Sequence, residues 1–326
     1  MNQLQPIYQR QNPSAVRQAG ALQAGTTIDG ELMARWIKYI NRRPKTVQTY
    51  TRAIRRFAEW LSAHGINRPG PDDINEYVRD LSENHKASTV QSYLNAVKLF
   101  FKWTELEGLY PNIAARATTE RPDNGFKKDY LTSGQVKRIL ERIDRTTLQG
   151  LRDYAIFTLT VTAGLRTIEL TRADIQDIRT VADCRALYIQ GKGRADKNEY
   201  VKLSAEVDAA ITDYLRARAD ADGKPAGEAP LFASLSNRDR GGRMTTRSLS
   251  RMIKERMRAA GYDSDRLTAH SLRHTAAALN LLNGATVEET RQLLRHTNVN
   301  TTLIYSHELE RAANKSEERI SRAIFE

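Results

Sequence analysis

The sequence HSLRH at residues 270–274 places two histidines one helical turn apart, which is also the spacing of two zinc ligands on a helix. Ser271, however, stands where a helical zinc protease carries its general-base glutamate. Arg273 would bring a fixed positive charge within a turn of the ion, and no cysteine or obvious carboxylate nearby completes a ligand set. We therefore expect no metal at this motif, and we interpret His274 as a structural histidine.

His270 and Arg273 lie three positions apart, so both project from one face of the predicted helix near its start. Thr268 is the expected cap of that helix and Gly284 its expected end. The helix N-terminus adds positive potential, and a guanidinium binds phosphate with two parallel hydrogen bonds. The pair therefore predicts an anion site, with phosphate as its natural guest.

A second arginine and a tyrosine stand elsewhere in the chain. Arg166, in AGLRTIEL, follows a predicted helix end at Gly164, and Glu169 is close enough in sequence to orient it. Taken alone, this pair is typical of a surface salt bridge. Tyr305, in HTNVNTTLIYSH, follows His296. A phenol, with a pKa of about 10, is a poor nucleophile unless nearby charge stabilises the phenolate.

The elements that must position these residues lie in the second half of the chain. RALYIQ and NEYVKLS are short β-prone runs on either side of GKGRADK, which predicts a hairpin with a basic turn containing Lys192 and Lys197. Helices are expected around it, two of them opened by the capping boxes Thr132–Gln135 and Thr286–Glu289.

Residues 29–108 predict helices only, because apolar residues such as Val47, Tyr50 and Ile54 recur at helical spacing. The polar positions between them carry cations that belong either to a solvated face or to a phosphate-contacting face. These candidate DNA-binding residues are Lys45, Arg52, Arg55, Arg56, Lys98 and Lys102.

The fold class expected is mainly α with a small β-sheet. The expected organisation is a flexible tail (1–27), a helical domain (28–112) that carries these cations, a linker (113–127), a mixed domain (128–306) that carries the candidate site residues, and a C-terminal tail (307–326). The linker is expected where prolines, a glycine and little periodicity follow the helices.

The bulk composition favours a polyanionic partner. The 326 residues include 51 Lys and Arg against 39 Asp and Glu, a net charge of +12. The single cysteine excludes an intrachain disulfide and favours a reducing compartment. We see no signal peptide and no apolar run long enough to cross a bilayer, so an intracellular protein of the cytoplasm and nucleoid is expected.

The whole set, in order, resembles the tyrosine recombinase, or phage integrase, family of the simple two-domain type. The resemblance covers about residues 29–326 and rests on AGLRTIEL, GKG between two β runs, HSLRHTAA and LLRHTNVNTTLIYSH. The residues that carry it are Arg166, Lys192, His270, Arg273, His296 and Tyr305. The helical first half is similar to that family's core-binding domain, and a separate arm-binding domain does not fit in the first 27 residues.

The resemblance implies a DNA-cutting reaction without metal, cofactor or ATP. Tyr305 would attack a phosphodiester to leave a 3′-phosphotyrosine and a free 5′-hydroxyl. Arg166 and Arg273 would stabilise the negative charge of the transition state, and His270 would handle the tyrosine proton. Lys192 would protonate the leaving oxygen, with Lys197 as its rival.

The resemblance further implies that His296 hydrogen-bonds the scissile phosphate. It implies a homotetramer on two paired duplex sites with inverted repeats, with the C-terminal residues Leu309, Ile320, Ile324 and Phe325 packing on a neighbouring subunit. Two alternatives stay open: a monomeric type IB topoisomerase-like nicking enzyme, and a DNA-binding regulator with an idle site. Integration or transposition of a mobile element, dimer resolution and inversion also stay open.

Overall fold

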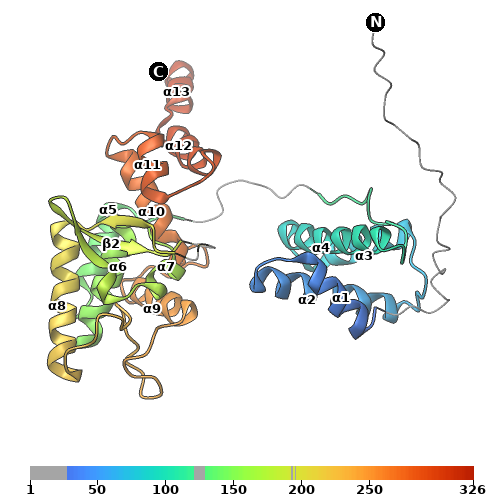
Figure 1. The fold of residues 1–326 in the computed structure, drawn as a ribbon. Helices are drawn as coiled ribbons and strands as arrows, with labels where there is room; N and C mark the ends of the chain where they lie inside the picture. The colour runs from blue at the N-terminus through green and yellow to red at the C-terminus, as the bar shows by residue number, and fades with distance from the viewer. Residues whose placement is uncertain (1–27, 121–128, 192–193, 195) are drawn as a thin grey trace, which may run out of the picture. The chain divides into compact units, whose positions relative to one another are not determined.

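The computed structural model describes residues 28–120, 129–191, 194 and 196–326. The chain divides into two compact units, Met1–Asn124 and Gly125–Glu326 (Figure 1). Each unit has its own hydrophobic core. The fold class expected from the sequence, helices with one small sheet, is confirmed. The residues 1–27 expected as a tail lie outside the described part of the chain.

The described part of the first unit holds helices α1 (Gly30–Ile40), α2 (Pro44–Ala63), α3 (Pro71–Asn84) and α4 (Ala87–Leu106). Both α2 and α3 begin with proline, whose fixed φ suits the first helical position. Aromatic rings fill the core between the helices. The Phe57 and Tyr77 ring centroids lie 4.9 Å apart, and those of Trp36 and Phe100 lie 5.5 Å apart.

The segment expected as a linker from residue 113 begins inside this core. Ala114 and Ala117 are buried against the helices of the first unit, because the chain makes two short turns there before it leaves the unit. Only residues beyond these alanines can serve as a connection, and 121–128 lie outside the described residues.

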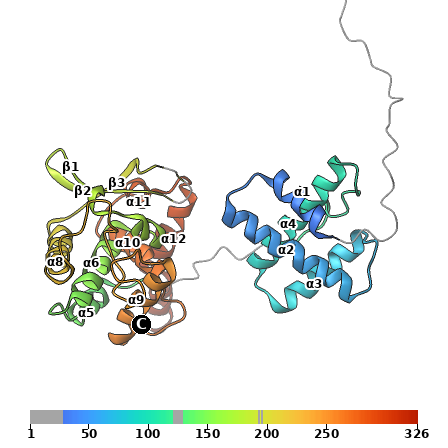
Figure 2. The ribbon, with the colours of Figure 1, turned by 60° about the horizontal axis from the view of Figure 1, so that its bottom comes forward.

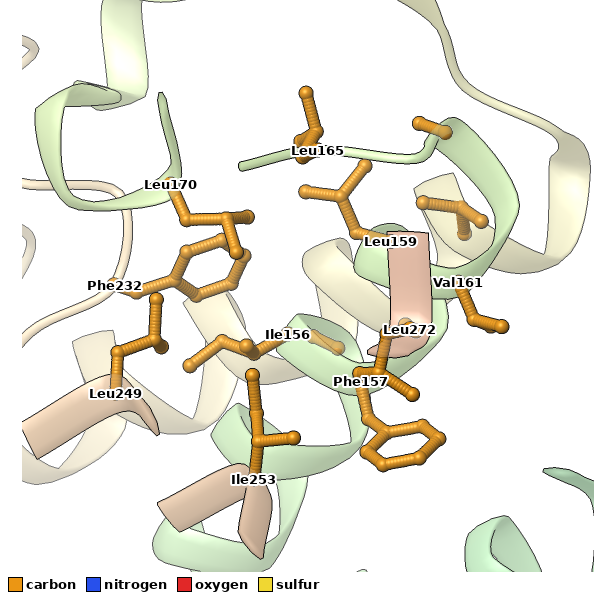
Figure 3. Close-up of a cluster of buried hydrophobic side chains, with 14 of the residues drawn as sticks. Ile156, Phe157, Leu159, Val161, Leu165, Leu170, Phe232, Leu249, Ile253 and Leu272 are labelled. Atoms are coloured by element: carbon orange, nitrogen blue, oxygen red, sulfur yellow. The ribbon is translucent and has the colours of Figure 1, made fainter. Parts of the chain in front are cut away.

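The second unit is built around α6 (Leu148–Ala163), which packs against α5 (Ser133–Glu141), α8 (Ala205–Asp222), α9 (Thr246–Ala259) and α10 (Ala269–Leu282). Figure 3 shows apolar side chains gathered around it, with Leu249 and Ile253 of α9 and Leu272 of α10 close to Ile156 and Phe157. The ends of α6 and α10 are thereby fixed relative to each other.

The sheet of this unit has the order β1–β2–β3 and is antiparallel throughout. Strands β2 (Cys184–Ile189) and β3 (Glu199–Lys202) form the expected hairpin, with Leu187 opposite Val201. The sequence analysis missed β1 (Ile178–Val181), a four-residue strand that follows a 3-10 helix (Ile175–Asp177) and places Ile178 opposite Leu187.

The remaining helices are α7 (Thr167–Arg172), α11 (Val287–Leu294), α12 (Asn300–Ala313) and α13 (Ser316–Phe325). Thr132 and Thr286 open α5 and α11 with the predicted capping boxes, and Thr268 is the N-cap of α10. The views in Figures 1 and 2 place α10, α11 and α12 side by side, and both α11 and α12 contact α10.

The residues expected as a C-terminal tail from 307 start within α12 rather than after it. The following helix α13 has no buried residue and projects from the unit (Figure 1). Its apolar side chains Ile320, Ile324 and Phe325 are 60%, 66% and 83% exposed. None of the described helices is both long and apolar enough to span a membrane.

Candidate active site

Two turns of the second unit lie beside α10. The first joins α6 to α7 at Gly164, and the second joins α11 to α12 and carries His296. The first half of α10 is also connected to the start of the unit, because the buried Leu131 amide donates to Thr275 Oγ1 at 2.9 Å. The predicted side chains therefore come from elements far apart in sequence.

Gly164 ends α6 in the left-handed conformation, with φ 58° and ψ 36°. A Cβ at this position would lie 2.6 Å from Leu294 Cδ2, so the close approach as well as the φ angle requires glycine. The Gly164 carbonyl oxygen accepts a hydrogen bond from Arg273 Nη1 at 2.5 Å. This turn thereby holds a side chain from a helix that begins more than a hundred residues later.

Arg166 is the N-cap of α7, and Glu169 holds it twice. Glu169 Oε2 accepts from the Arg166 amide at 2.8 Å, and Oε1 accepts from Arg166 Nη1 at 2.8 Å. Glu169 is fully buried, and burial alone would raise the pKa of its carboxyl. The guanidinium groups of Arg295 and Arg166 outweigh burial and leave that pKa below its ordinary value, so the carboxylate is charged. The expected orienting role of Glu169 fits this geometry.

Arg273 is 1% exposed, and its Nη2 donates to the Leu294 carbonyl oxygen. Burial, together with the positive charges of Arg166 and Arg295, lowers the pKa of Arg273 to about 9. The group is therefore still a cation at neutral pH. The charge of Arg166 thus reaches Arg273, so the two predicted phosphate-binding arginines lie close together, and paired cations of this kind can stabilise an oxyanion.

His296 is 8% exposed and its Nδ1 shares a hydrogen bond of 2.9 Å with the buried Thr302 hydroxyl. Burial lowers the pKa of His296 to about 4, and the charges of Arg273, Arg166, Arg295 and His270 act in the same direction. A neutral imidazole at pH 7 can donate one hydrogen bond and accept another. This side chain belongs to the same cluster as both arginines.

Tyr305 lies on α12 and is 5% exposed. Burial raises the pKa of its phenol to about 12, although the Arg273 charge acts in the opposite direction. Its oxygen is 2.5 Å from His274 Nδ1, and the two ring centroids are 5.3 Å apart. His274, interpreted from the sequence as a structural histidine, therefore contacts the predicted nucleophile directly.

His270 lies at the exposed start of α10, and its ring meets the edge of His274 with 4.6 Å between centroids. The two histidines, four residues apart as zinc ligands on a helix would be, instead contact each other through their rings, and His274 Nδ1 is directed at the Tyr305 oxygen. Within the described ranges, no group of three or more His, Cys, Asp or Glu side chains is arranged around a common metal position.

The predicted general acid, Lys192, lies outside the described residues. Its rival Lys197 is described, and two carboxylates hold it: Asp174 Oδ2, at 2.6 Å from its Nζ, and Asp177. A lysine held by two carboxylates of its own chain is not free to reach a leaving oxygen, which disfavours Lys197 as the mobile general acid.

The six candidate DNA-binding cations lie on α2 and α4 of the first unit, and none forms an ion pair with another described residue. Arg52, Arg55 and Arg56 line a depression of about 490 Å³ together with Glu59 and with Tyr93 of α4. Positive side chains without carboxylate partners are available to phosphates.

The sequence analysis missed Arg295, which is the C-cap of α11. Its side chain is 91% buried, which a charged residue next to His296 does not indicate from sequence. Its guanidinium reaches Glu169 Oε2 at 3.1 Å. The only signal in the sequence was a charged residue directly after the apolar pair Leu293–Leu294.

Comparison with known proteins decides the family. The model of the phage integrase family matches residues 129–311, and that of the phage integrase N-terminal SAM-like domain matches residues 32–108. The chain belongs to the phage integrase family. The enzyme class expected from the sequence, a tyrosine site-specific recombinase, is confirmed, and neither alternative is favoured.

Relatives of this family member include two bacterial enzymes. The tyrosine recombinase XerD of Bifidobacterium longum is 28% identical over 270 residues, which cover 80% of this chain and 86% of the relative. The tyrosine recombinase XerC of Caldanaerobacter subterraneus subsp. tengcongensis is 34% identical over 192 residues, 57% of this chain but only half of the relative.

Two solved integrase-family structures share the fold. The XerH recombinase bound to palindromic difH, a post-cleavage complex, superposes with a TM-score of 0.69 at 21% identity, covering 88% of this chain and 84% of that one. A lambda integrase tetramer bound to a Holliday junction gives a TM-score of 0.63 at 17% identity, covering 83% and 76%.

Proposed function

We propose that this recombinase cuts and rejoins duplex DNA through Tyr305, with Arg166, Arg273 and His296 binding the scissile phosphate. The observation that carries the proposal is the cluster itself. The charge of Arg273 acts on the buried phenol of Tyr305, and Arg273 in turn lies close enough to Arg166 and His296 for their charges to interact. Arg273 has no carboxylate partner among the described residues, and Arg166 shares the carboxylate of Glu169 with Arg295. Both cations are therefore suited to the developing charge of a phosphoryl transition state.

In the proposed step the Tyr305 oxygen attacks phosphorus and the bond from phosphorus to the 5′ oxygen breaks. The products are a 3′-phosphotyrosine and a 5′-hydroxyl, whose proton comes from Lys192. The phenolic proton leaves toward His274 Nδ1, which lies 2.5 Å away, and toward His270 beside it. Attack by another 5′-hydroxyl reverses the step, so the phosphodiester energy is retained and no nucleotide is consumed.

We propose that the substrate is a pair of duplex sites with inverted repeats, held by four copies of the chain. The net charge of +12 and the six cations on α2 and α4 favour a DNA partner. The apolar residues of α13, which are mostly exposed in the described part of the chain, fit packing on a neighbouring copy. The lambda integrase structure, which is a tetramer on a Holliday junction, supports this assembly by analogy. We further propose that the enzyme acts at the nucleoid in the cytoplasm, because that is where such a DNA substrate is found.

The test is covalent capture of DNA. Nicked suicide duplexes with randomised arms are incubated with the protein in excess EDTA, and adducts are separated on a denaturing gel and sequenced. We expect wild type to form an adduct and Tyr305→Phe to form none while it still shifts the captured duplex. An adduct that persists in Tyr305→Phe, or one that forms only after Mg²⁺ or Zn²⁺ is restored, would refute the proposal.

A further inference from the structure

The backbone of Arg295 is unusual for its residue type. It ends α11 with φ 55° and ψ 45°, a left-handed conformation that glycine adopts freely and other residues adopt at a cost. In the described part of the chain only Asn41, Ala182 and Arg295 are non-glycine residues with positive φ. Glycine is the usual residue after a helix in this conformation, so an arginine here requires an explanation from its side chain.

The Arg295 side chain connects two turns that carry site residues. Its Nη1 donates to the Leu293 carbonyl oxygen at 2.7 Å, and its Nη2 donates to Glu169 Oε2 at 3.1 Å. Longer contacts of 3.4 Å reach the carbonyl oxygens of Ala163 and Gly164. The guanidinium thus crosslinks the α11–α12 turn to the α6–α7 turn.

Arg295 shares two of its acceptors with the predicted phosphate-binding residues. Glu169 offers Oε1 to Arg166 and Oε2 to Arg295. The Gly164 carbonyl oxygen accepts from Arg273 and also from Arg295. A carboxylate divided between two guanidinium groups neutralises neither completely, so Arg166 keeps positive charge for a phosphate.

The hydrogen bonds of Arg295 do not satisfy its whole guanidinium group. Its Nε atom is buried without a hydrogen-bond partner among the described residues, and a buried cation of this kind is costly. The cost is incurred next to His296, the following residue in the chain. A glycine would have formed the same turn without the strain or the buried charge.

We propose that Arg295 is a positioning residue for DNA cleavage: it holds Glu169 and Gly164, which in turn hold Arg166 and Arg273 in place for the phosphate. The inference rests on the proposed function, because the reaction it affects is attack by Tyr305. It adds a third arginine to the site, one that acts through the other two rather than on the DNA.

The test compares Arg295→Gly with Arg295→Lys and with Ala182→Gly. Ala182 is an exposed residue in the β1–β2 turn with φ 49°, so its glycine variant relieves a similar backbone conformation away from the site. The probe is the duplex captured covalently by wild type. Binding is measured by gel shift, and the rate of adduct formation by single turnover at saturating duplex.

We expect Arg295→Gly to bind the probe within about threefold of wild type but to form adduct about 10–100-fold more slowly, the loss typical of residues that support a reacting group. Ala182→Gly should match wild type in both measurements. The acid limb of the rate should move to higher pH in Arg295→Gly, because removal of this cation weakens the suppression of His296 protonation by Arg273, Arg166, Arg295 and His270.

A wild-type adduct rate in Arg295→Gly, with the acid limb unchanged, would overturn the proposal. Should Arg295→Gly fail to fold, Arg295→Lys decides. Lysine keeps the charge but cannot span Glu169 and the carbonyl groups together, so we expect a slowed rate, and a wild-type rate would overturn the proposal. Failure of the proposed function is distinguishable, since wild type itself would then form no adduct.

Discussion

Substitution of Gly164 by alanine tests how the site is held together. Two costs add in this variant. The left-handed φ of 58° costs about 1–2 kcal/mol for a residue with a Cβ. The new methyl would also lie 2.6 Å from Leu294 Cδ2 and 3.4 Å from Ala276 Cβ, and such overpacking of a dense core costs about 1–3 kcal/mol.

The free energy of unfolding should therefore fall by about 2–5 kcal/mol. For a unit of this size, that corresponds to a Tm lower by about 5–15 °C in calorimetry. Adduct formation should also slow at temperatures where the variant is folded, because the displaced carbonyl oxygen is the acceptor of Arg273 Nη1. Duplex binding through the first unit should change little.

Two controls separate the costs. Gly284, with φ 92° and no atom within 4 Å of an added Cβ, lies in the same unit, so Gly284→Ala shows the backbone cost alone. In a Leu294→Ala background the clash partner is gone, and Gly164→Ala should then cost only about as much as Gly284→Ala. If Gly164→Ala destabilises wild type no more than Gly284→Ala does, the close approach of the two turns is not what fixes Arg273.

Three further predictions concern charge. Because the pKa of His296 is about 4 in the folded chain and about 6.5 when unfolded, the unfolded state binds the extra proton, so stability should fall by about 3 kcal/mol from pH 6.5 to 4. The free energy of unfolding of His296→Gln, measured in urea, should fall less than that of wild type between pH 6.5 and pH 4. If the two plots of this free energy against pH run parallel, the prediction is wrong. Replacing Arg52, Arg55 and Arg56 by alanine should lower the salt slope of duplex binding by up to about 2.7, and an unchanged slope would place the phosphates elsewhere. Lys192→Ala should slow cleavage of normal DNA but not of a substrate with a 5′-bridging sulfur, whose leaving group needs no proton. If the sulfur substrate restores cleavage by Lys197→Ala and not by Lys192→Ala, Lys197 is the general acid.

The parts of the fold that local sequence determines were predicted well. Most helices of both units follow from apolar spacing and from caps such as Thr132 and Thr286, whose bonds form within four residues. The short helix α7 and the break between α12 and α13 were not predicted. Strand β1 was missed because four residues have little signal of their own, and their conformation depends on pairing with β2.

The site was predictable only as far as its order along the chain. Motif order was enough to group Arg166, Arg273, His296 and Tyr305, which the structure brings together. It was not enough to find the contact between His274 and Tyr305, which joins residues 31 positions apart. The ion pair of Lys197 with Asp174 was hidden for the same reason, because it depends on how the hairpin folds back over the preceding turn.

Arg295 shows why the remaining residues could not be found from sequence. Its role depends on a left-handed backbone, on a carboxylate 126 positions earlier and on two carbonyl oxygens beside that carboxylate, none of which a local pattern contains. Together with Arg166 and Arg273 it forms a cluster of three guanidinium groups that influence one another, and Glu169, the buried carboxylate beside them, pairs with Arg166 and Arg295. Such an excess of cations opposes folding through desolvation and mutual repulsion, as the lowered pKa of Arg273 shows. We infer that a fold that retains this excess at the end of its central helix is arranged for an anion, and in the proposed function that anion is the phosphate that Tyr305 attacks.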